Sequence, residues 1–542
     1  MQMLKRKSGI TLVALIITII ILLILAGVSL SFVFNGGILD KTQQAVNEYE
    51  NASQKEQDLL NKIDEYIKNE LVGDNSDVNE GYNGEPNAPK LTEGMIPVKY
   101  NETIEKWVIT NEDDEEWYNY TNKQWANVML SDGKYKTSKS NEYTTDGTTQ
   151  VEVADLGSMF VWIPRYAYKI ESGYHSSTTG TIDVKFLNGS TNEAEKGVSI
   201  VEYNEDTTEN YTKFPEGYVV HAAFTDKVEV GGWDNNIEGI WIAKFEAGYP
   251  MEGSIDSTLK TSSSMYYPVF KGQKYSYNWT TVGNLYKLGR EMSSSGNPYE
   301  IISSSNSHMI KNSEWGAVAY LTQSEYGKNS EIYPNNVSFE ADRQSIAGKE
   351  VYGITGYSAA GVNDGKNDAT GKQIGETIGN STVWYKEAGY EASTTGNITG
   401  VYDMSGANLE YVANVIPSGH PNIATYGGEI ASVTGAGKSN KYITAYPVGN
   451  STQENTNSIN SYPYWGKLYG DAVWEISNGT GSNTAWNMDA MAGDNLNDQV
   501  FFMRGAGSGW GWNSSAGIYA FSDDNCVGGL NESTSRVVFV IE

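Results

Sequence analysis

The distribution of apolar and polar residues divides the chain into segments of different character. Residues 10–34 carry no charge and are mostly apolar, and about 20 apolar residues are enough for a helix to cross a bilayer. Within residues 35–72, a stripe of residues that is apolar only in part recurs at alternating intervals of four and three positions. This spacing predicts a stalk helix. Gly, Asn, Asp and Pro break that pattern at residues 73–90, which indicates a linker. After residue 91 the pattern changes to short strands separated by turns.

Aromatic and β-branched runs predict the strands of this second part. The clearest runs lie at residues 159–170, 239–249 and 535–542. A hairpin is predicted over residues 106–120, where two such runs flank an acidic turn. One helix is predicted over residues 307–327, because its apolar side chains fall broadly on one face.

Long polar stretches separate these elements. They are rich in Ser, Thr, Asn and Gly and lie around residues 251–264, 293–307, 325–395 and 415–460. Loops of this length are uncommon in compact domains unless they cover a surface or bind something. We therefore expect these stretches either to cover a surface or to bind something.

The expected fold class is α+β, with a long N-terminal transmembrane and stalk helix followed by a β-rich head with long loops. The head consists of a small β-rich module at residues 91–150 and a larger domain at residues 151–542. The basic leader, residues 1–9, precedes the predicted span, and acidic residues predominate on its C-terminal side. By the positive-inside bias, the N-terminus is expected inside and the head outside a cell membrane that the chain crosses once.

Charge and cysteine content exclude several classes of site. The chain has 38 basic and 67 acidic residues, a net charge of −29, so nucleic acid is not an expected partner. The lone Cys526 excludes an internal disulfide framework and a thiolate zinc cluster, and four scattered histidines do not suggest a metal site. We expect no cofactor. Calcium at the Asx-rich residues 362–371 is an unsupported alternative, because they lack the spacing of an EF-hand loop.

The N-terminus resembles that of type IV pilins and pseudopilins. Lys7-Ser8-Gly9 is followed by Ile10-Thr11-Leu12-Val13, and this resemblance implies that prepilin peptidase cuts between Gly9 and Ile10. Those families usually carry a glutamate where this chain has Ala14. The absence of that carboxylate favours a membrane-held protein over a polymerised filament subunit.

The head resembles the formylglycine-generating-enzyme (sulfatase-modifying factor) family, a variant of the C-type lectin fold. The resemblance rests on segments that occur in the same order in both: FVWIP at 160–164, IWIAKFEAG at 240–248, NSEWGAVAYL at 312–321, GVYDMSGANLEYV at 400–412, and MRGAGSG…SRVVF at the end. It implies a C-type-lectin-like domain from about residue 155 to the C-terminus. The sulfatase-modifying enzymes use a cysteine pair that holds copper, and Cys526 is alone. An enzyme of that type is therefore not expected.

The last forty residues also resemble the frame of surface proteins that are diversified by retroelements. The frame-like residues are Arg504, Gly505, Ala516, Gly517 and Arg536. The resemblance implies that the residues between them form a ligand-binding face: Trp510, Trp512, Asn513, Ser514, Ser522, Asp523, Asp524, Asn525, Asn531, Glu532 and Thr534. Indole rings provide large, rigid contact area at low entropic cost. The alternative is that both indoles pack into the core beneath the long loops.

The function expected from these observations is that of a membrane-anchored, adhesin-like or receptor-like surface protein. Its C-terminal face would bind an external protein or glycan. Two alternatives come from other classes: a minor pilin or pseudopilin of a type IV pilus or type II secretion machine, and an extracellular enzyme of the formylglycine-generating type.

Overall fold

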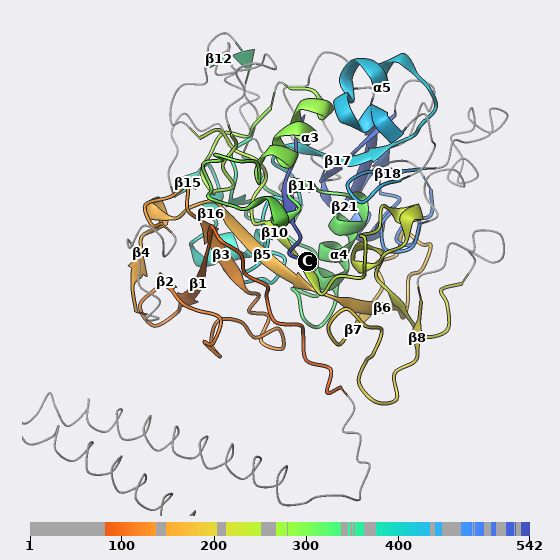
Figure 1. Ribbon diagram of the computed structural model, residues 1–542, viewed down its shortest axis with the longest axis horizontal. Helices are drawn as coiled ribbons and strands as arrows, with labels where there is room; N and C mark the ends of the chain where they lie inside the picture. The colour runs from red at the N-terminus through yellow and green to blue at the C-terminus, as the bar shows by residue number, and fades with distance from the viewer. Residues whose placement is uncertain are drawn as a thin grey trace, which may run out of the picture. The chain divides into compact units, whose positions relative to one another are not determined.

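A computed structural model describes most of the head. The described residues are 82–136, 148–202, 213–250, 267–278, 280–337, 345–346, 349–350, 353–362, 376–433, 439–446, 468–479, 481, 483–492, 500–505, 516–524, 526 and 533–542. Residues 80–542 form one compact unit (Figure 1). The predicted leader, span and stalk lie outside the described residues, as do Gly9 and Ile10 at the expected cleavage site.

The described chain corrects the expected fold class. It is β-rich, and its longest helix has 12 residues. None of the helices in this part of the chain is long and apolar enough to span a bilayer. The expected fold class is therefore corrected to a β-rich fold with short helices, and nothing in the described residues corresponds to the expected transmembrane and stalk helix or supports the expected single-pass membrane location.

The largest sheet has eight strands, and each neighbouring pair runs antiparallel. Its order is β11 (His308–Met309), β23 (Val537–Phe539), β10 (Gly239–Ala243), β5 (Met159–Pro164), β3 (Asn127–Leu130), β1 (Met95–Asn101), β2 (Lys106–Ile109) and β4 (Gln150–Val151). Strands from the predicted small module at residues 91–150 thus pair directly with strands of the predicted larger domain. All six residues of β5 are buried, so the sheet is covered on both faces at its centre.

The predicted hairpin over residues 106–120 was wrong. β2 pairs with β1 on one side, with Tyr100 opposite Trp107, and with β4 on the other side. The residues after β2 turn away from the sheet, and the buried Trp117 donates its indole hydrogen bond to the carbonyl of Asn127 at 2.9 Å.

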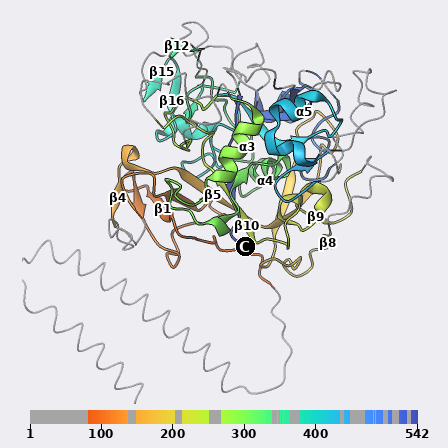
Figure 2. The same ribbon diagram turned by 45° about the horizontal axis from the view of Figure 1, so that its top comes forward.

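Smaller sheets complete the β structure. One contains β18 (Thr444–Ala445), β17 (Leu409–Val415), β20 (Phe501–Gly505), β21 (Gly517–Asp524) and β19 (Met491–Ala492), with β22 (Ser533–Thr534) also paired to β17. The others are β7 (Ile182–Phe186), β6 (Tyr166–Ile170), β9 (Tyr218–Val220) and β8 (Ile200–Val201); β14 (Tyr357–Ser358), β16 (Ser381–Val383) and β15 (Thr377–Ile378); and β12 (Ser345–Ile346) with β13 (Lys349–Glu350). Figures 1 and 2 both place β4 and α5 on opposite sides of the head.

The helices are short, and one of them is central. The α-helices are α3 (Val282–Glu291), α4 (Asn312–Gln323) and α5 (Pro421–Tyr426); the 3-10 helices are η2 (Val153–Asp155), η3 (Ala222–Phe224), η4 (Val228–Val230), η6 (Ser303–Ser305), η8 (Glu387–Ala392), η9 (Gly428–Val433) and η11 (Trp486–Met488). Every residue of α4 is buried, so this predicted helix has no solvent-facing side. Gly316 makes that possible, because a Cβ there would lie 2.0 Å from the carbonyl oxygen of Gly470.

The end of the predicted linker is held against the large sheet. Two buried indoles donate to its backbone: Trp162 to the carbonyl of Asn87 at 3.0 Å and Trp241 to the carbonyl of Lys90 at 2.6 Å. Residues 87–90 are therefore part of the head.

Candidate functional site

Most of the predicted C-terminal face lies outside the described residues. This applies to Trp510, Trp512, Asn513, Ser514, Asn525, Asn531 and Glu532. Ser522, Asp523 and Asp524 belong to β21, where they pair with Met503, Phe502 and Phe501 of β20. Thr534 requires a correction: its side chain is fully buried and its hydroxyl donates to the carbonyl of Ala247 at 3.3 Å. It packs the interior and does not face a ligand.

The predicted frame residues lie in tightly packed surroundings. The buried Arg504 donates to the side-chain oxygen of Asn312 and to the carbonyl of Ala472, both at 3.0 Å. Gly505 has a φ of +84°, a left-handed conformation that favours glycine. A Cβ on Gly517 would lie 1.9 Å from a carboxylate oxygen of Asp489. Ala516 is half-buried just before β21.

Arg536 lies in a sealed cluster of carboxylates. It forms a bidentate ion pair with Glu410, in which Nε donates to Oε2 at 2.8 Å and Nη2 donates to Oε1. Glu246 and Asp403 are buried nearby, and burial raises the pKa of Asp403 to about 6 and that of Glu410 to about 7. Since all four side chains are at most 1% exposed, this sealed centre has no surface to offer a ligand.

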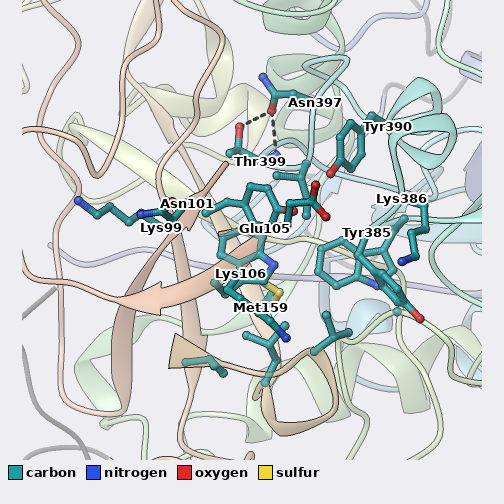
Figure 3. A pocket seen from close by; sticks show the side chains of 18 of the residues that line it. Lys99, Asn101, Glu105, Lys106, Met159, Tyr385, Lys386, Tyr390, Asn397 and Thr399 are labelled. Atoms are coloured by element: carbon teal, nitrogen blue, oxygen red, sulfur yellow. Dashed lines mark hydrogen bonds between the residues drawn. The ribbon is translucent and has the colours of Figure 1, made fainter. Parts of the chain in front are cut away.

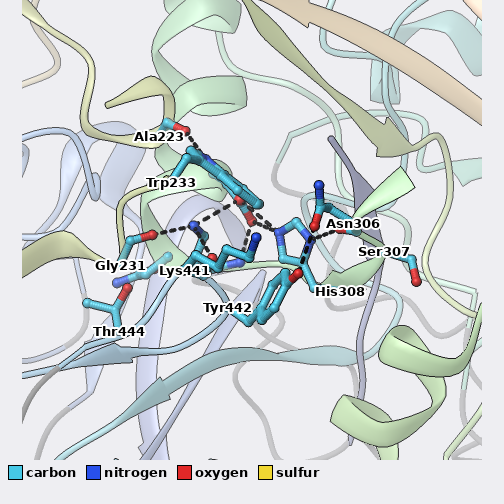
Figure 4. A network of polar contacts seen from close by, with 12 residues as sticks. Ala223, Gly231, Trp233, Asn306, Ser307, His308, Lys441, Tyr442 and Thr444 are labelled. Atoms are coloured by element: carbon cyan, nitrogen blue, oxygen red, sulfur yellow. Dashed lines mark hydrogen bonds and ion pairs between the residues drawn. The ribbon is translucent and has the colours of Figure 1, made fainter. Parts of the chain in front are cut away.

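A second buried network surrounds α4 (Figure 4). His308 Nε2 lies 2.9 Å from Glu314 Oε1, and the ammonium of Lys311 lies 4.3 Å from the ring centroid of Trp233. Burial alone would raise the pKa of Glu314, but the charges of His308 and Lys311 bring it below its ordinary value. These groups satisfy one another, and the network therefore holds α4 in place without facing solvent.

An open groove of about 1640 Å³ lies between the β1–β2 hairpin and η8. Figure 3 shows Lys99, Asn101 and Lys106 from the hairpin on one side, and Tyr385, Lys386 and Tyr390 on the other. Amide and carboxylate side chains make up much of the remaining lining: Asn101, Glu102, Glu105, Asn122, Gln124, Gln273, Glu376, Glu387, Glu391 and Asn397.

A continuous row of aromatic rings runs along this groove. The ring centroids of Tyr100 and Trp107 lie 5.6 Å apart, those of Trp107 and Trp384 6.2 Å, and those of Trp384 and Tyr385 5.7 Å. These separations are within the range of favourable aromatic pairs. All four residues line the groove, and we call them the aromatic row.

A buried lysine fixes the floor beneath the row. The ammonium of Lys244 donates to the side chain of Asn127 at 2.9 Å and to the carbonyls of Ile398 and Gly400, both at 2.7 Å. It also lies 5.5 Å and 5.8 Å from the ring centroids of Trp107 and Trp384. Burial holds the pKa of Lys244 well below its ordinary value. Its hydrogen bonds connect β10 to the 397–400 segment and hold the groove in a fixed shape.

The two indoles of the row each have an unused donor. Within the part of the chain that the structure describes, Trp107 Nε1 and Trp384 Nε1 are buried and have no hydrogen-bond partner. Leaving such a donor without a partner costs about 1–3 kcal/mol. The indole edge of Trp384 lies against Gly272, where a Cβ would be 2.3 Å from Nε1. Neither donor is used by the described residues of the protein itself.

The tyrosines at the groove keep their phenolic protons at neutral pH. Burial, followed by a hydrogen bond with Tyr100, raises the pKa of Tyr390 above its ordinary value. Burial and the charge of Glu376 also raise the pKa of Tyr385. Both side chains therefore present a ring face together with a polar hydroxyl at neutral pH.

Reasoning from the sequence missed this groove, because its walls come from segments far apart in the chain. The available signal was the long polar stretch at residues 325–395, whose length indicates a loop that covers a surface or binds something. Part of that stretch, from Glu376 to Glu391, forms one wall. Comparison with family models and with curated proteins gives no match to this sequence.

Proposed function

We propose that this protein binds a carbohydrate through the groove, without catalysing a reaction on it. The observation that carries the proposal is the aromatic row, which lines an open groove whose other walls include many amide and carboxylate side chains. The ligand-binding role expected from the sequence is kept, and the binding surface is moved to this groove.

The chemistry of the lining matches that of a sugar. A pyranose ring has an apolar C–H face, which packs on the electron-rich face of an aromatic ring, and an edge of hydroxyls that both donate and accept. The partly exposed Tyr100 and Tyr385, at the two ends of the row, supply the ring faces, and the buried Trp107 and Trp384 pack between them. Asn101, Gln124 and Asn397 supply amides that can satisfy hydroxyls in either direction. A peptide ligand would instead need apolar pockets for its anchoring side chains or a free sheet edge.

The rigid floor favours binding of this kind. Lys244 holds the 397–400 segment by hydrogen bonds to two of its carbonyls, so little ordering is left to occur when a ligand arrives. A preorganised site loses less of its binding free energy to the ordering of side chains and loops.

The test is binding of the full-length chain to glycan and protein arrays, followed by titration of the glycans that bind. Tyr385→Ala, which removes the outermost ring of the row, is expected to weaken glycan binding by tenfold or more, as truncation of an anchor does. Tyr426→Ala removes a tyrosine at the end of α5, outside the groove, and is expected to leave binding unchanged. Array binding to proteins alone, or equal affinity of both variants, contradicts the proposal.

A further inference from the structure

We propose that the part of the groove around Lys271 binds the carboxylate of an acidic sugar, so that the ligand is an oligosaccharide with sparse uronic acid residues. This inference rests on the proposed function, because the carboxylate would reach Lys271 as part of a sugar held on the aromatic row. It adds a preference that the rings alone do not supply.

Lys271 differs from three other lysines of the groove, which form ion pairs. Lys99 lies 2.8 Å from carboxylate oxygens of both Asp114 and Glu116. Lys106 lies 2.5 Å from Glu152, and Lys386 lies 3.5 Å from Glu376. Among the described residues, no carboxylate is within ion-pairing distance of Lys271, although its side chain is partly buried and lines the groove.

The carboxylate that most influences Lys271 is already in use. Asp132 accepts hydrogen bonds from the backbone amide and the hydroxyl of Ser158, both at 2.6 Å. Lys274 and Lys136 add like charge, and burial first, then these two lysines, lower the pKa of Lys271 despite Asp132. A cation that is partly desolvated and repelled by its neighbours gains from an external anion.

The residue after Lys271 joins this lysine to the aromatic row. Gly272 lies against the indole edge of Trp384, and Trp384 Nε1 has no partner among the described residues. The described chain therefore presents to the groove an ammonium without a counter-ion, beside a tightly packed and buried indole. A carboxylate in the groove can accept a charge-assisted hydrogen bond from this ammonium.

The surrounding charges limit how many carboxylates the ligand can carry. Glu102, Glu105 and Glu387 also line the groove, and the whole chain has a net charge of −29. A ligand with a carboxylate on every residue would bring some of them against these glutamates, which repel them. One carboxylate among neutral sugars meets Lys271 without that cost.

The test compares acidic probes with their neutral counterparts on the full-length chain, by titration calorimetry at low salt. The probes are xylo-oligosaccharides carrying one glucuronic acid and hexasaccharides of alternating glucuronic acid and N-acetylglucosamine. Each is paired with its carboxyl-reduced form. We expect the acidic form to bind about tenfold more tightly, equivalent to about 1.4 kcal/mol, and this preference to shrink with added salt.

Two lysine variants form a matched pair. Lys271→Gln is expected to abolish the preference while keeping affinity for the carboxyl-reduced probes. Lys386→Gln removes a groove lysine that already pairs with Glu376 and is expected to keep the preference. If Lys271→Gln retains the full preference, the assignment of the carboxylate site is overturned.

The remaining outcomes separate this inference from the proposed function. Equal binding of acidic and reduced probes, both weakened by Tyr385→Ala, overturns the acidic preference and leaves the carbohydrate groove intact. Absence of binding by any of these probes, with array binding to proteins only, overturns both. A polyglutamate peptide that binds as tightly and is unaffected by Tyr385→Ala would mark the groove as a peptide site and overturn both as well.

Discussion

The sealed centre around Arg536 and the groove along the aromatic row use similar side chains for opposite purposes. In the sealed centre Arg536 is neutralised by Glu410, and Asp403 accepts from Asn335 at 2.8 Å and from the amide of Gly356 at 2.9 Å. In the groove Lys271 has no ion pair and two indole N–H groups have no partner in the described chain. Completed pairing indicates a structural role, whereas an ammonium without an ion pair in an open groove indicates a ligand.

The largest expected effect comes from breaking the sealed centre. Arg536→Ala leaves Glu410 buried without its counter-ion, and removal of one partner of a buried pair costs about 3–5 kcal/mol. Chemical denaturation should show this loss in the free energy of unfolding. The double variant Arg536→Met with Glu410→Leu should recover most of it. A loss under about 1 kcal/mol for Arg536→Ala would contradict the structural role.

A smaller loss of stability, together with a loss of binding, is expected at the groove floor. Lys244→Met leaves Asn127, Ile398 and Gly400 without their shared donor, which should cost about 2–4 kcal/mol. Because the 397–400 segment is released, carbohydrate binding should weaken by about tenfold or more at a temperature where the variant is still folded. If the folded variant binds carbohydrate with unchanged affinity, the hydrogen bonds of Lys244 do not contribute to the binding site.

The strands and the central helix were predictable because they are local patterns. Residues 159–170, 239–249 and 535–542 contain strands, and residues 307–327 contain α4, at the places that apolar periodicity indicates. The hairpin over residues 106–120 was wrong, because β2 finds its partners in β1 and β4 and neither is visible from its own sequence.

The candidate site could not be predicted from the sequence, because its central contact joins distant segments. Trp107 lies on β2 and Trp384 follows β16, and their proximity depends on how a long polar stretch folds back over the large sheet. The predicted face was built from residues near the C-terminus. Of these, Thr534 is buried because β22 pairs with β17.

A buried carboxylate gives the third prediction, a pH dependence of stability. Glu475 accepts hydrogen bonds from Tyr168 and Tyr320, both at 2.7 Å, and burial raises its pKa from the ordinary 4.5 to about 7. The folded state then holds a proton that the unfolded state releases, so the free energy of unfolding falls as pH rises from about 4.5 to about 7.

The effect of Glu475 should be on the order of 1–3 kcal/mol. Denaturation curves recorded at intervals across this pH range measure it. Glu475→Gln should flatten the dependence, since glutamine carries no titrating proton. If the variant keeps the slope of the parent protein, Glu475 is not its source.

The smallest expected effect is a steric change in the groove. Gly272→Ala places a Cβ only 2.3 Å from Trp384 Nε1. Because this distance is too short, either the indole or the 271–274 segment must move. We expect about 1–2 kcal/mol of lost stability and a several-fold loss of affinity for the acidic probes, measured by calorimetry. An unaltered affinity would mean that the position of Trp384 does not influence the site.

The location of the ligand is the most direct test of the account. Hydrogen–deuterium exchange of the full-length chain should be measured with and without the xylo-oligosaccharide that carries one glucuronic acid. We predict slower exchange at residues 99–107, 271–274 and 384–399, the walls of the groove, and no change at residues 500–534. Protection confined to residues 500–534 would return binding to the C-terminal face and contradict the groove as the site.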